Sequence, residues 1–228
     1  MARPSTIAID GPAASGKSTL GHYLAENFDY LYLDTGVLYR AVTWAALERG
    51  FPIEDEVAIT KLAEDLPIEV MPPTVDDGRQ YTIRVAERDI TWAIRTPEVD
   101  RAVSPVSAYP GVREALTRQM RKIAEQGDVV MVGRDIGTVV LPDADFKLYV
   151  TASAEERAKR RYLERLEQGK KVPYETVLAA IHRRDRIDSS REAAPLRPAD
   201  DALHFDNTNL SIEGMFREVE RLLKRMDC

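Results

Sequence analysis

One glycine-rich segment near the start of the chain limits the possible folds more than any other feature. It reads Gly11-Pro12-Ala13-Ala14-Ser15-Gly16-Lys17-Ser18 and matches the pattern G-x-x-x-x-G-K-[ST]. A strand-like apolar run at residues 6–10 precedes it, and a helix-compatible segment follows. In that setting the loop presents backbone N–H groups and a helix dipole to phosphate. The context disfavours a chance glycine-rich turn and predicts an α/β phosphate-binding protein.

The side chains of this loop have expected roles of their own. Lys17 is placed to reach the β- and γ-phosphates of a nucleotide, and Ser18 is placed to hold Mg²⁺. Such loops occur in kinases, GTPase switches and ATPase motors alike, so other segments must distinguish these classes. Phosphate contacts are expected from Gly11, Pro12, Ala13, Ala14, Ser15, Gly16, Lys17, Ser18 and Thr19.

Short apolar runs recur along the chain and are separated by segments long enough for helices. The runs lie at residues 6–10, 30–34, 129–133, 146–150 and 202–206, and the helices at 16–28, 36–49, 112–126, 154–168, 174–189 and 211–225. This alternation predicts an α/β fold of three layers, with a five-stranded parallel sheet between helices on both faces. Between residues 67 and 95, strand-like runs around an Asp77-Gly78 turn predict a small antiparallel insert.

The predicted elements divide the chain into two functional regions. Residues 1–35 and 104–228 are expected to form the phosphate-binding core, with an arginine-rich lid at about 154–171. Residues 36–103 are expected to form the region that binds the acceptor, and this region includes the insert.

Composition excludes several classes of partner. The formal net charge of −6 over 228 residues disfavours binding to a nucleic acid polymer, which rests on an excess of Lys and Arg. No apolar run approaches 18 residues and no signal-peptide pattern follows Met1, so a soluble protein without a membrane partner is expected. The single cysteine, Cys228, indicates a reducing cytosol and therefore a cytoplasmic location.

Basic residues nevertheless gather in two short stretches, 157–171 and 183–191, which predicts a local site for a polyanion. Asp34, Arg40, Arg134 and Asp135 follow predicted strands, at the edge where an open α/β sheet binds its ligands. Each of them alone could be a solvated surface charge. Together they indicate a second anionic ligand facing Lys17.

These turns, together with the segment Arg184-Asp185-Arg186-Ile187-Asp188, closely resemble those of the bacterial cytidylate kinases. The resemblance covers nearly the whole chain, including the insert. It implies a monomeric phosphotransferase that uses ATP and Mg²⁺ and acts on small nucleotides, CMP and also dCMP. It implies acceptor contacts from Thr35, Arg40, Ser104, Arg113, Arg134, Asp135, Arg184, Asp188 and Arg191.

By this resemblance Arg40 and Arg134 hold the acceptor phosphate, while Ser104, Arg113 and Asp135 line the cytosine. The chemistry is compatible with that assignment, because Asp135 can accept from the exocyclic amine and Arg113 can donate to ring N3. Uracil reverses this polarity, and a buried mismatched polar pair costs roughly 1–3 kcal/mol. CMP is therefore expected to be favoured over UMP.

Arg184, Asp188 and Arg191 are spaced i, i+4, i+7, which places all three on one face of a predicted helix. The resemblance assigns the first two to the sugar hydroxyls of the acceptor and Arg191 to phosphate. An intrahelical salt bridge is the competing explanation.

Arg157, Arg161 and Arg165 recur every four residues and resemble the arginine lid of nucleoside monophosphate kinases, although a solvated helix is the alternative. Such a lid excludes water and adds positive charge to the transferred phosphoryl group. The acceptor phosphate oxygen is already anionic, so neither an acid nor a base is required. The expected catalytic residues are Lys17, Arg157 and Arg161.

Two other functions fit parts of the pattern. One is a related P-loop kinase acting on UMP or on a small metabolite, and the other is a nucleotide-regulated switch that turns over slowly. The basic acceptor cleft and the insert disfavour the small metabolite.

Overall fold

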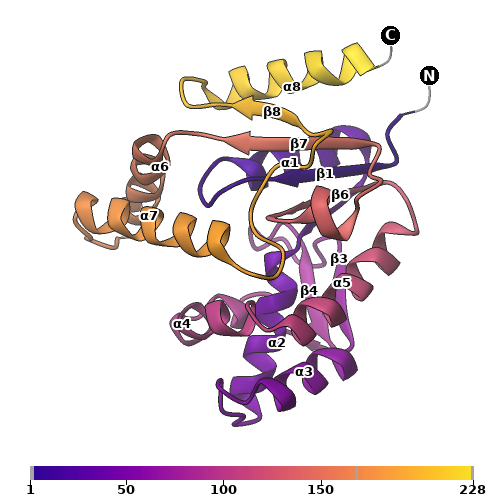
Figure 1. Cartoon of the computed structure of the whole chain (residues 1–228), viewed down its shortest axis with the longest axis vertical. Coiled ribbons are helices and arrows are strands. Elements are labelled where there is room, and N and C mark those ends of the chain that lie inside the picture. The colour runs from indigo at the N-terminus through magenta and orange to yellow at the C-terminus, as the bar shows by residue number, and fades with distance from the viewer. Residues whose placement is uncertain (1–2, 168, 227–228) are drawn as a thin grey trace.

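The computed structural model describes residues 3–167 and 169–226. Gln168, the predicted end of one helix, and Cys228 lie outside these ranges. The upper part of Figure 1 is a sheet with its flanking helices. Helix α2 (Gly36–Glu48) leads from this sheet to a second group of helices and strands below it. Within the described part of the chain, no helix is both long enough and apolar enough to cross a membrane.

The central sheet consists of β1 (Thr6–Asp10), β2 (Leu31–Asp34), β6 (Val129–Gly133), β7 (Phe146–Thr151) and β8 (Leu203–Asp206). Its strand order is β2-β6-β1-β7-β8, and every neighbouring pair is parallel. All five residues of β6 are buried, as expected for a strand covered on both faces. The prediction of a five-stranded parallel sheet is confirmed.

The six predicted helices are present, with ends within two residues of those expected. They are α1 (Lys17–Phe28), α2, α5 (Pro110–Ala124), α6 (Ala154–Glu167), α7 (Tyr174–Ser190) and α8 (Ile212–Met226). Two irregular turns, η1 (Ala93–Arg95) and the π-helical η2 (Ile136–Val140), lie between them.

Two further helices, α3 (Glu56–Asp65) and α4 (Pro97–Val106), were not predicted from the sequence. Both begin at a recognisable cap. The Asp55 side chain accepts a hydrogen bond from Ala58 N, and Thr96 accepts from the backbone of α4 just before a proline at the first helical position. These caps were the available signal for both helices.

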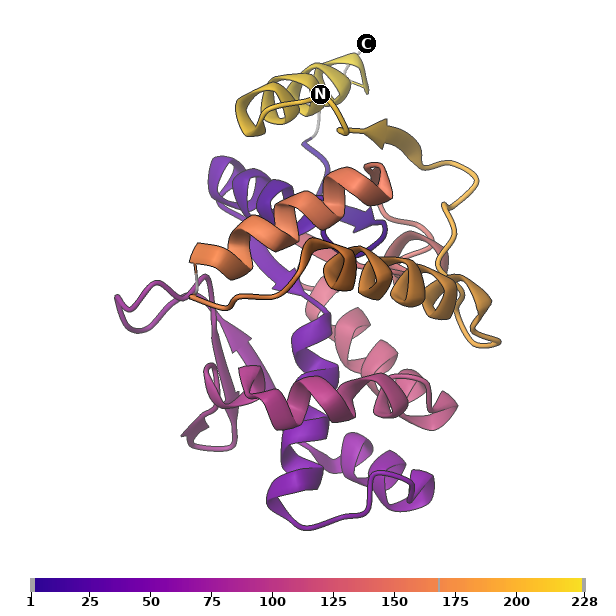
Figure 2. The same ribbon diagram turned by 90° about the vertical axis from the view of Figure 1, so that its left-hand side faces the viewer.

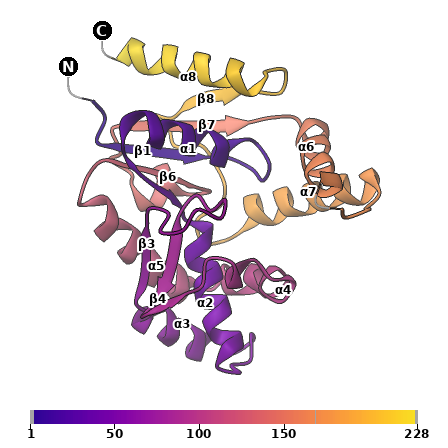
Figure 3. The ribbon, with the colours of Figure 1, turned by 180° about the vertical axis from the view of Figure 1, so that it is seen from behind.

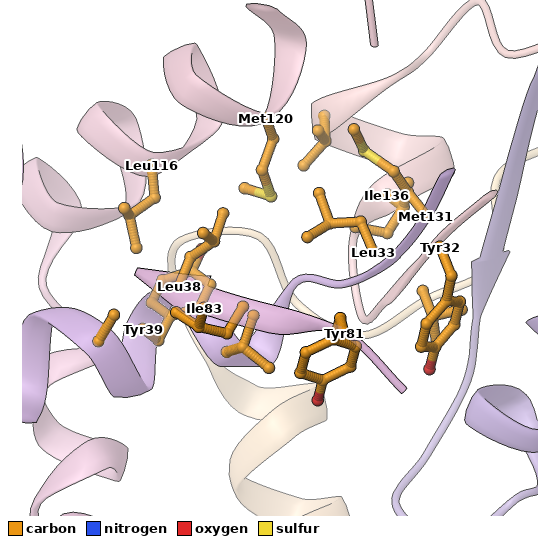
Figure 4. Close-up of a cluster of buried hydrophobic side chains, with 14 of the residues drawn as sticks. Tyr32, Leu33, Leu38, Tyr39, Tyr81, Ile83, Leu116, Met120, Met131 and Ile136 are labelled. Atoms are coloured by element: carbon orange, nitrogen blue, oxygen red, sulfur yellow. The ribbon is translucent and has the colours of Figure 1, made fainter. Parts of the chain in front are cut away.

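Helices cover both faces of the sheet. On one face α1 packs closely, since a Cβ atom built on Gly21 would lie 2.5 Å from Val132 Cγ2 and 3.5 Å from Val130 Cγ1. Figure 3 shows α1 in front of β1 from that side. On the other face Leu33 and Met131 lie in the apolar cluster that includes side chains of α5 and α2 (Figure 4).

The predicted insert is a three-stranded antiparallel sheet of β3 (Ile68–Met71), β4 (Thr82–Val85) and β5 (Arg88–Asp89). Arg79 fixes the loop at its end, because its guanidinium binds Asp77 at 2.7 Å and Asp89 at 2.6 Å. Ile83 of β4 is fully buried and joins the main core, so the insert is packed onto the rest of the protein.

The carboxyl ends of the parallel strands point toward the α6–α7 hairpin, as the arrowheads of β1 and β7 in Figure 1 show. Figure 2 views the molecule from this end, with α6 and α7 side by side across the front. The hairpin, the loop before α1 and the upper part of α2 therefore surround one edge of the sheet.

The close approach at Gly21 predicts opposite effects of alanine at two helical glycines. Gly21→Ala should lower the free energy of unfolding by about 1–3 kcal/mol, because overpacking exceeds the gain in helix propensity. Gly214→Ala in α8 is the matched control, since its added Cβ meets no atom closer than 3.4 Å. It should be neutral or stabilising in urea unfolding, and equal effects at both positions would contradict the packing described here.

Candidate active site

The glycine-rich loop between β1 and α1 has the backbone conformation that its sequence predicts. Gly11 and Gly16 have φ values of 145° and 89°, which favour glycine. A Cβ on Gly11 would also lie 2.0 Å from the carbonyl oxygen of Val150, so no other residue fits there. The loop curls back on itself, and Lys17 Nζ donates to Pro12 O at 2.6 Å.

Lys17 is almost completely buried and lies among charges of both signs. Only 5% of its surface is exposed. Burial, and next the positive charge of Arg134, lower the pKa of Lys17 well below its ordinary value, and Arg184 acts in the same direction. Lys17, Arg134 and Arg184 therefore lie in one electrostatic environment, although they come from three different elements.

Oxygen atoms suited to a hard cation lie beside this lysine. Ser18 Oγ donates to Asp34 Oδ2 at 3.3 Å, and Asp34 Oδ1 accepts from Gly36 N at 3.1 Å. Among the described residues no group of three or more His, Cys, Asp or Glu side chains is close enough to hold a metal by itself. A cation here would need ligand atoms from a bound nucleotide.

Asp10, the last residue of β1, ties the glycine-rich loop to the turn after β6. Its two carboxylate oxygens accept from Ile136 N at 2.8 Å and Gly137 N at 2.7 Å. Burial raises the pKa of Asp10 to about 6, against the opposing effect of these two backbone bonds. The turn that contains Arg134 and Asp135 is thereby fixed relative to the start of the loop.

Arg113 of α5 and Asp135, in the turn after β6, form a buried ion pair. Arg113 Nη2 donates to Asp135 Oδ2 at 2.5 Å, and Nη1 donates to Ser107 O at 3.0 Å. The Arg113 guanidinium also lies 5.4 Å from the ring centroid of Tyr39. The structure thus brings together two residues that the sequence analysis assigned to the base.

Arg134, from the turn after β6, contacts α7 at Asp188, close to Arg184. Asp188 Oδ2 accepts from Arg134 Nε at 2.8 Å and lies 3.9 Å from Arg184 Nε. Desolvation, then the nearby charge of Arg134, lowers the pKa of Arg184, although 60% of its side chain is open to solvent. Asp188 therefore balances two neighbouring arginines.

Arg191 differs from its expected placement. Helix α7 ends at Ser190 and Arg191 has extended backbone, so the prediction that Arg184, Asp188 and Arg191 share one helix face is wrong for Arg191. The residues from Arg191 onward form an irregular segment of bends, in which Pro195 disfavours a continued helix. Arg191 still lies near Arg113 and Asp188, which contribute to its electrostatic environment.

Two buried groups in this region have no hydrogen-bond partner within the described residues. They are the Tyr39 hydroxyl and the Nε and Nη2 atoms of Arg191. Both groups are influenced by Arg113 and Asp135. Because unsatisfied buried donors are costly, a ligand rich in acceptor atoms is the natural partner for them.

Three other predicted acceptor residues lie on α2, at its start and on α4. Arg40 binds Asp100 at 2.7 Å and the carbonyl of Ile94 at 3.0 Å. The Thr35 hydroxyl donates to Val132 O at 3.0 Å, which joins the start of α2 to β6. Ser104 is exposed near the end of α4.

The predicted lid corresponds to α6 and the start of the following loop. Arg161 is exposed and pairs with Glu164 at 2.7 Å, and Arg165 lies in the last turn of the helix. Arg157 is buried instead, with a bidentate ion pair to Asp185 at 2.9 and 2.7 Å. The three arginines therefore have different surroundings despite their regular spacing.

Sequence analysis missed Arg160, which lies against the glycine-rich loop. Its Nη1 and Nη2 atoms donate to Asn207 Oδ1 and Asn207 O, both at 3.0 Å. Asn207 Nδ2 in turn donates to Ser15 O at 2.8 Å. The only available signals were the basic stretch around Arg160 and the polar turn after β8.

Comparison with known proteins agrees with this geometry. A model of the cytidylate kinase family matches residues 7–225. A cytidylate kinase of Bacillus licheniformis is 46% identical over 100% of this chain and 98% of its own length, and one of Chloroflexus aggregans is 51% identical over 92% and 90%. A solved, uncharacterised protein of Eubacterium ventriosum superposes with a TM-score of 0.50 at 14% identity, covering 96% of this chain and 98% of its own, which concerns the fold alone. The chain belongs to the cytidylate kinase family.

Proposed function

We propose that this protein transfers the γ-phosphate of ATP to CMP, and also to dCMP, giving ADP and CDP or dCDP. One observation supports this above the others: the loop with Lys17 follows β1, and the turn with Arg134 follows the adjacent parallel strand β6 and is tied to Asp10 by two hydrogen bonds. Two anionic ligands bound at these neighbouring turns would meet end to end, as phosphoryl transfer requires. Membership of the cytidylate kinase family over nearly the whole chain supports CMP as the acceptor.

On the donor side, the backbone of residues 11–19 is proposed to hold the phosphates of ATP, with Lys17 at the β- and γ-phosphates. Mg²⁺ would be held by Ser18, beside Asp34, and would neutralise charge on the phosphate oxygens. The hydroxyl and carboxylate oxygens present there suit that ion, which usually shares its ligands with nucleotide phosphates.

On the acceptor side, Arg40, Arg134 and Arg191 are proposed to bind the phosphate of CMP, since a guanidinium fork matches phosphate oxygens. Arg184 and Asp188 would bind the sugar hydroxyls. The cytosine would lie against Arg113, Asp135 and Ser104, with Thr35 shaping the wall. Of these residues, Arg40 lies in the region 36–103 that was expected to bind the acceptor, and the others belong to the core.

The chemical step needs position and charge rather than proton transfer. Arg161 would add positive charge near the transferred group when α6 approaches the nucleotide. Arg157 would contribute through the one N–H group that does not bind within the protein. The enzyme is proposed to work as a cytoplasmic monomer on free nucleotides.

A coupled assay of ATP consumption with CMP, dCMP, UMP, AMP and GMP tests this proposal directly. CMP should give the highest kcat/KM, and UMP should be weaker because it reverses the donor and acceptor pattern facing Arg113 and Asp135. A nucleotide-regulated switch would show no stimulation by any monophosphate. A preference for UMP would instead favour the related kinase.

Lys17→Met should abolish turnover while leaving the fold intact. The substitution removes a positive charge aimed at phosphate, and a loss of about 10² or more in kcat is expected by analogy with other electrostatic contacts to the reacting group. Because the charge is already desolvated, the variant should unfold at the same or a higher temperature than wild type. Lost circular dichroism would show a structural role instead.

Asp188→Ala should raise the KM for CMP more than the KM for ATP. The substitution leaves Arg134 without its partner at 2.8 Å and removes the proposed sugar contact. Steady-state kinetics with each substrate varied in turn separates the two constants. Equal increases for both nucleotides would be incompatible with the acceptor assignment.

A further inference from the structure

Arg157 lies near the start of α6, yet its guanidinium is held on several sides. Nε donates to Ala152 O at 2.9 Å, and Nη1 donates to Ala13 O of the glycine-rich loop at 3.3 Å. Both Nη atoms bind the carboxylate of Asp185. Four of the five N–H groups that an arginine offers are thus used within the protein. Such a side chain is fixed in place rather than free to swing.

Asp185 belongs to α7, which also contains a residue of the acceptor side. Asp185 binds Arg157, and Asp188, less than one turn further along, binds Arg134. Asp185 therefore joins α7 to Arg157, whose Nη1 donates to Ala13 O of the glycine-rich loop. Asp188 joins the same helix to an acceptor arginine.

Apolar packing reinforces the connection. Ala158 of α6 and Val177 and Ile181 of α7 form a small buried cluster, and Ala13 and Ala14 of the loop pack against it. The α6–α7 hairpin is therefore seated on the glycine-rich loop next to the Arg157–Asp185 pair. A displacement of the hairpin would change the position of the Ala13 carbonyl.

From this geometry we infer that Asp185 is a positioning residue: through Arg157 it holds the phosphate-binding loop against α7 and so couples donor binding to acceptor binding. Two parallel hydrogen bonds fix the direction of the guanidinium as well as its distance. Ordering by the first nucleotide then lowers the cost of ordering for the second. The inference rests on the proposed function, because it concerns the same two nucleotide sites.

The test compares wild type with Asp185→Asn in the full chain. Calorimetry measures CMP binding without donor and with the β,γ-imido analogue of ATP and Mg²⁺. For wild type the analogue should tighten CMP binding about fivefold or more, a usual size for coupling between sites. For Asp185→Asn the ratio should fall to about one, and kcat should drop about tenfold or more because the loop is less well placed.

Glu218→Gln is the matched control, since it breaks an exposed ion pair with Arg221 at 3.1 Å on α8. It should keep both the coupling ratio and kcat. Arg157→Lys keeps the positive charge but lacks the two-pronged guanidinium, so its coupling ratio should fall to about one, as for Asp185→Asn. The double variant should have the same coupling ratio as either single variant.

Thermal unfolding checks that each variant is folded at the assay temperature. If Asp185→Asn is not folded there, Arg157→Lys takes its place in the comparison. Retention of the wild-type ratio by the folded variant overturns the inference, as does the lack of coupling in a wild-type enzyme that phosphorylates CMP. A wild-type protein that does not phosphorylate CMP contradicts the proposed function instead.

Discussion

The site depends on aspartates that offset the positive charges of Lys17 and its neighbouring arginines. Burial lowers the pKa of Lys17, and the charges of Arg134 and Arg184 lower it further. Asp188 offsets part of the positive charge at Arg134, and Asp135 does so at Arg113. A ligand with several negative oxygens would add to this compensation.

The aspartates at the sheet edge and on α7 also fix the positions of the arginines around them. Asp10 holds the turn after β6 by two backbone N–H groups, so Arg134 has a defined starting position even without ligand. An arrangement set before binding costs little reorganisation during the reaction. Asp10, Asp135 and Asp188 thus fix the positions of the basic residues around them before any ligand binds.

The sheet and most helices could be predicted because burial on both faces imposes apolar runs such as that of β6, and because the glycine-rich motif fixes its own surroundings. Helices α3 and α4 were missed, since their caps are short signals within a polar region. Candidate site residues could be chosen from the family pattern, but their partners within the protein could not. Arg157 meets Asp185 through tertiary packing of two helices, and Arg160 meets Asn207 across 47 positions of sequence, with no periodicity to reveal either contact.

The strand order has a consequence for how the chain is made. β1 occupies the centre of the sheet, yet its two neighbours, β6 and β7, begin at Val129 and Phe146. During synthesis the ribosome must release more than half of the polypeptide before β1 can find either partner, while the region between emerges earlier. Pairing of segments so distant in sequence is slow, and the unpaired edges of β1 are open to misassociation in the meantime. The central sheet therefore cannot form around β1 until β6 and β7 have been made.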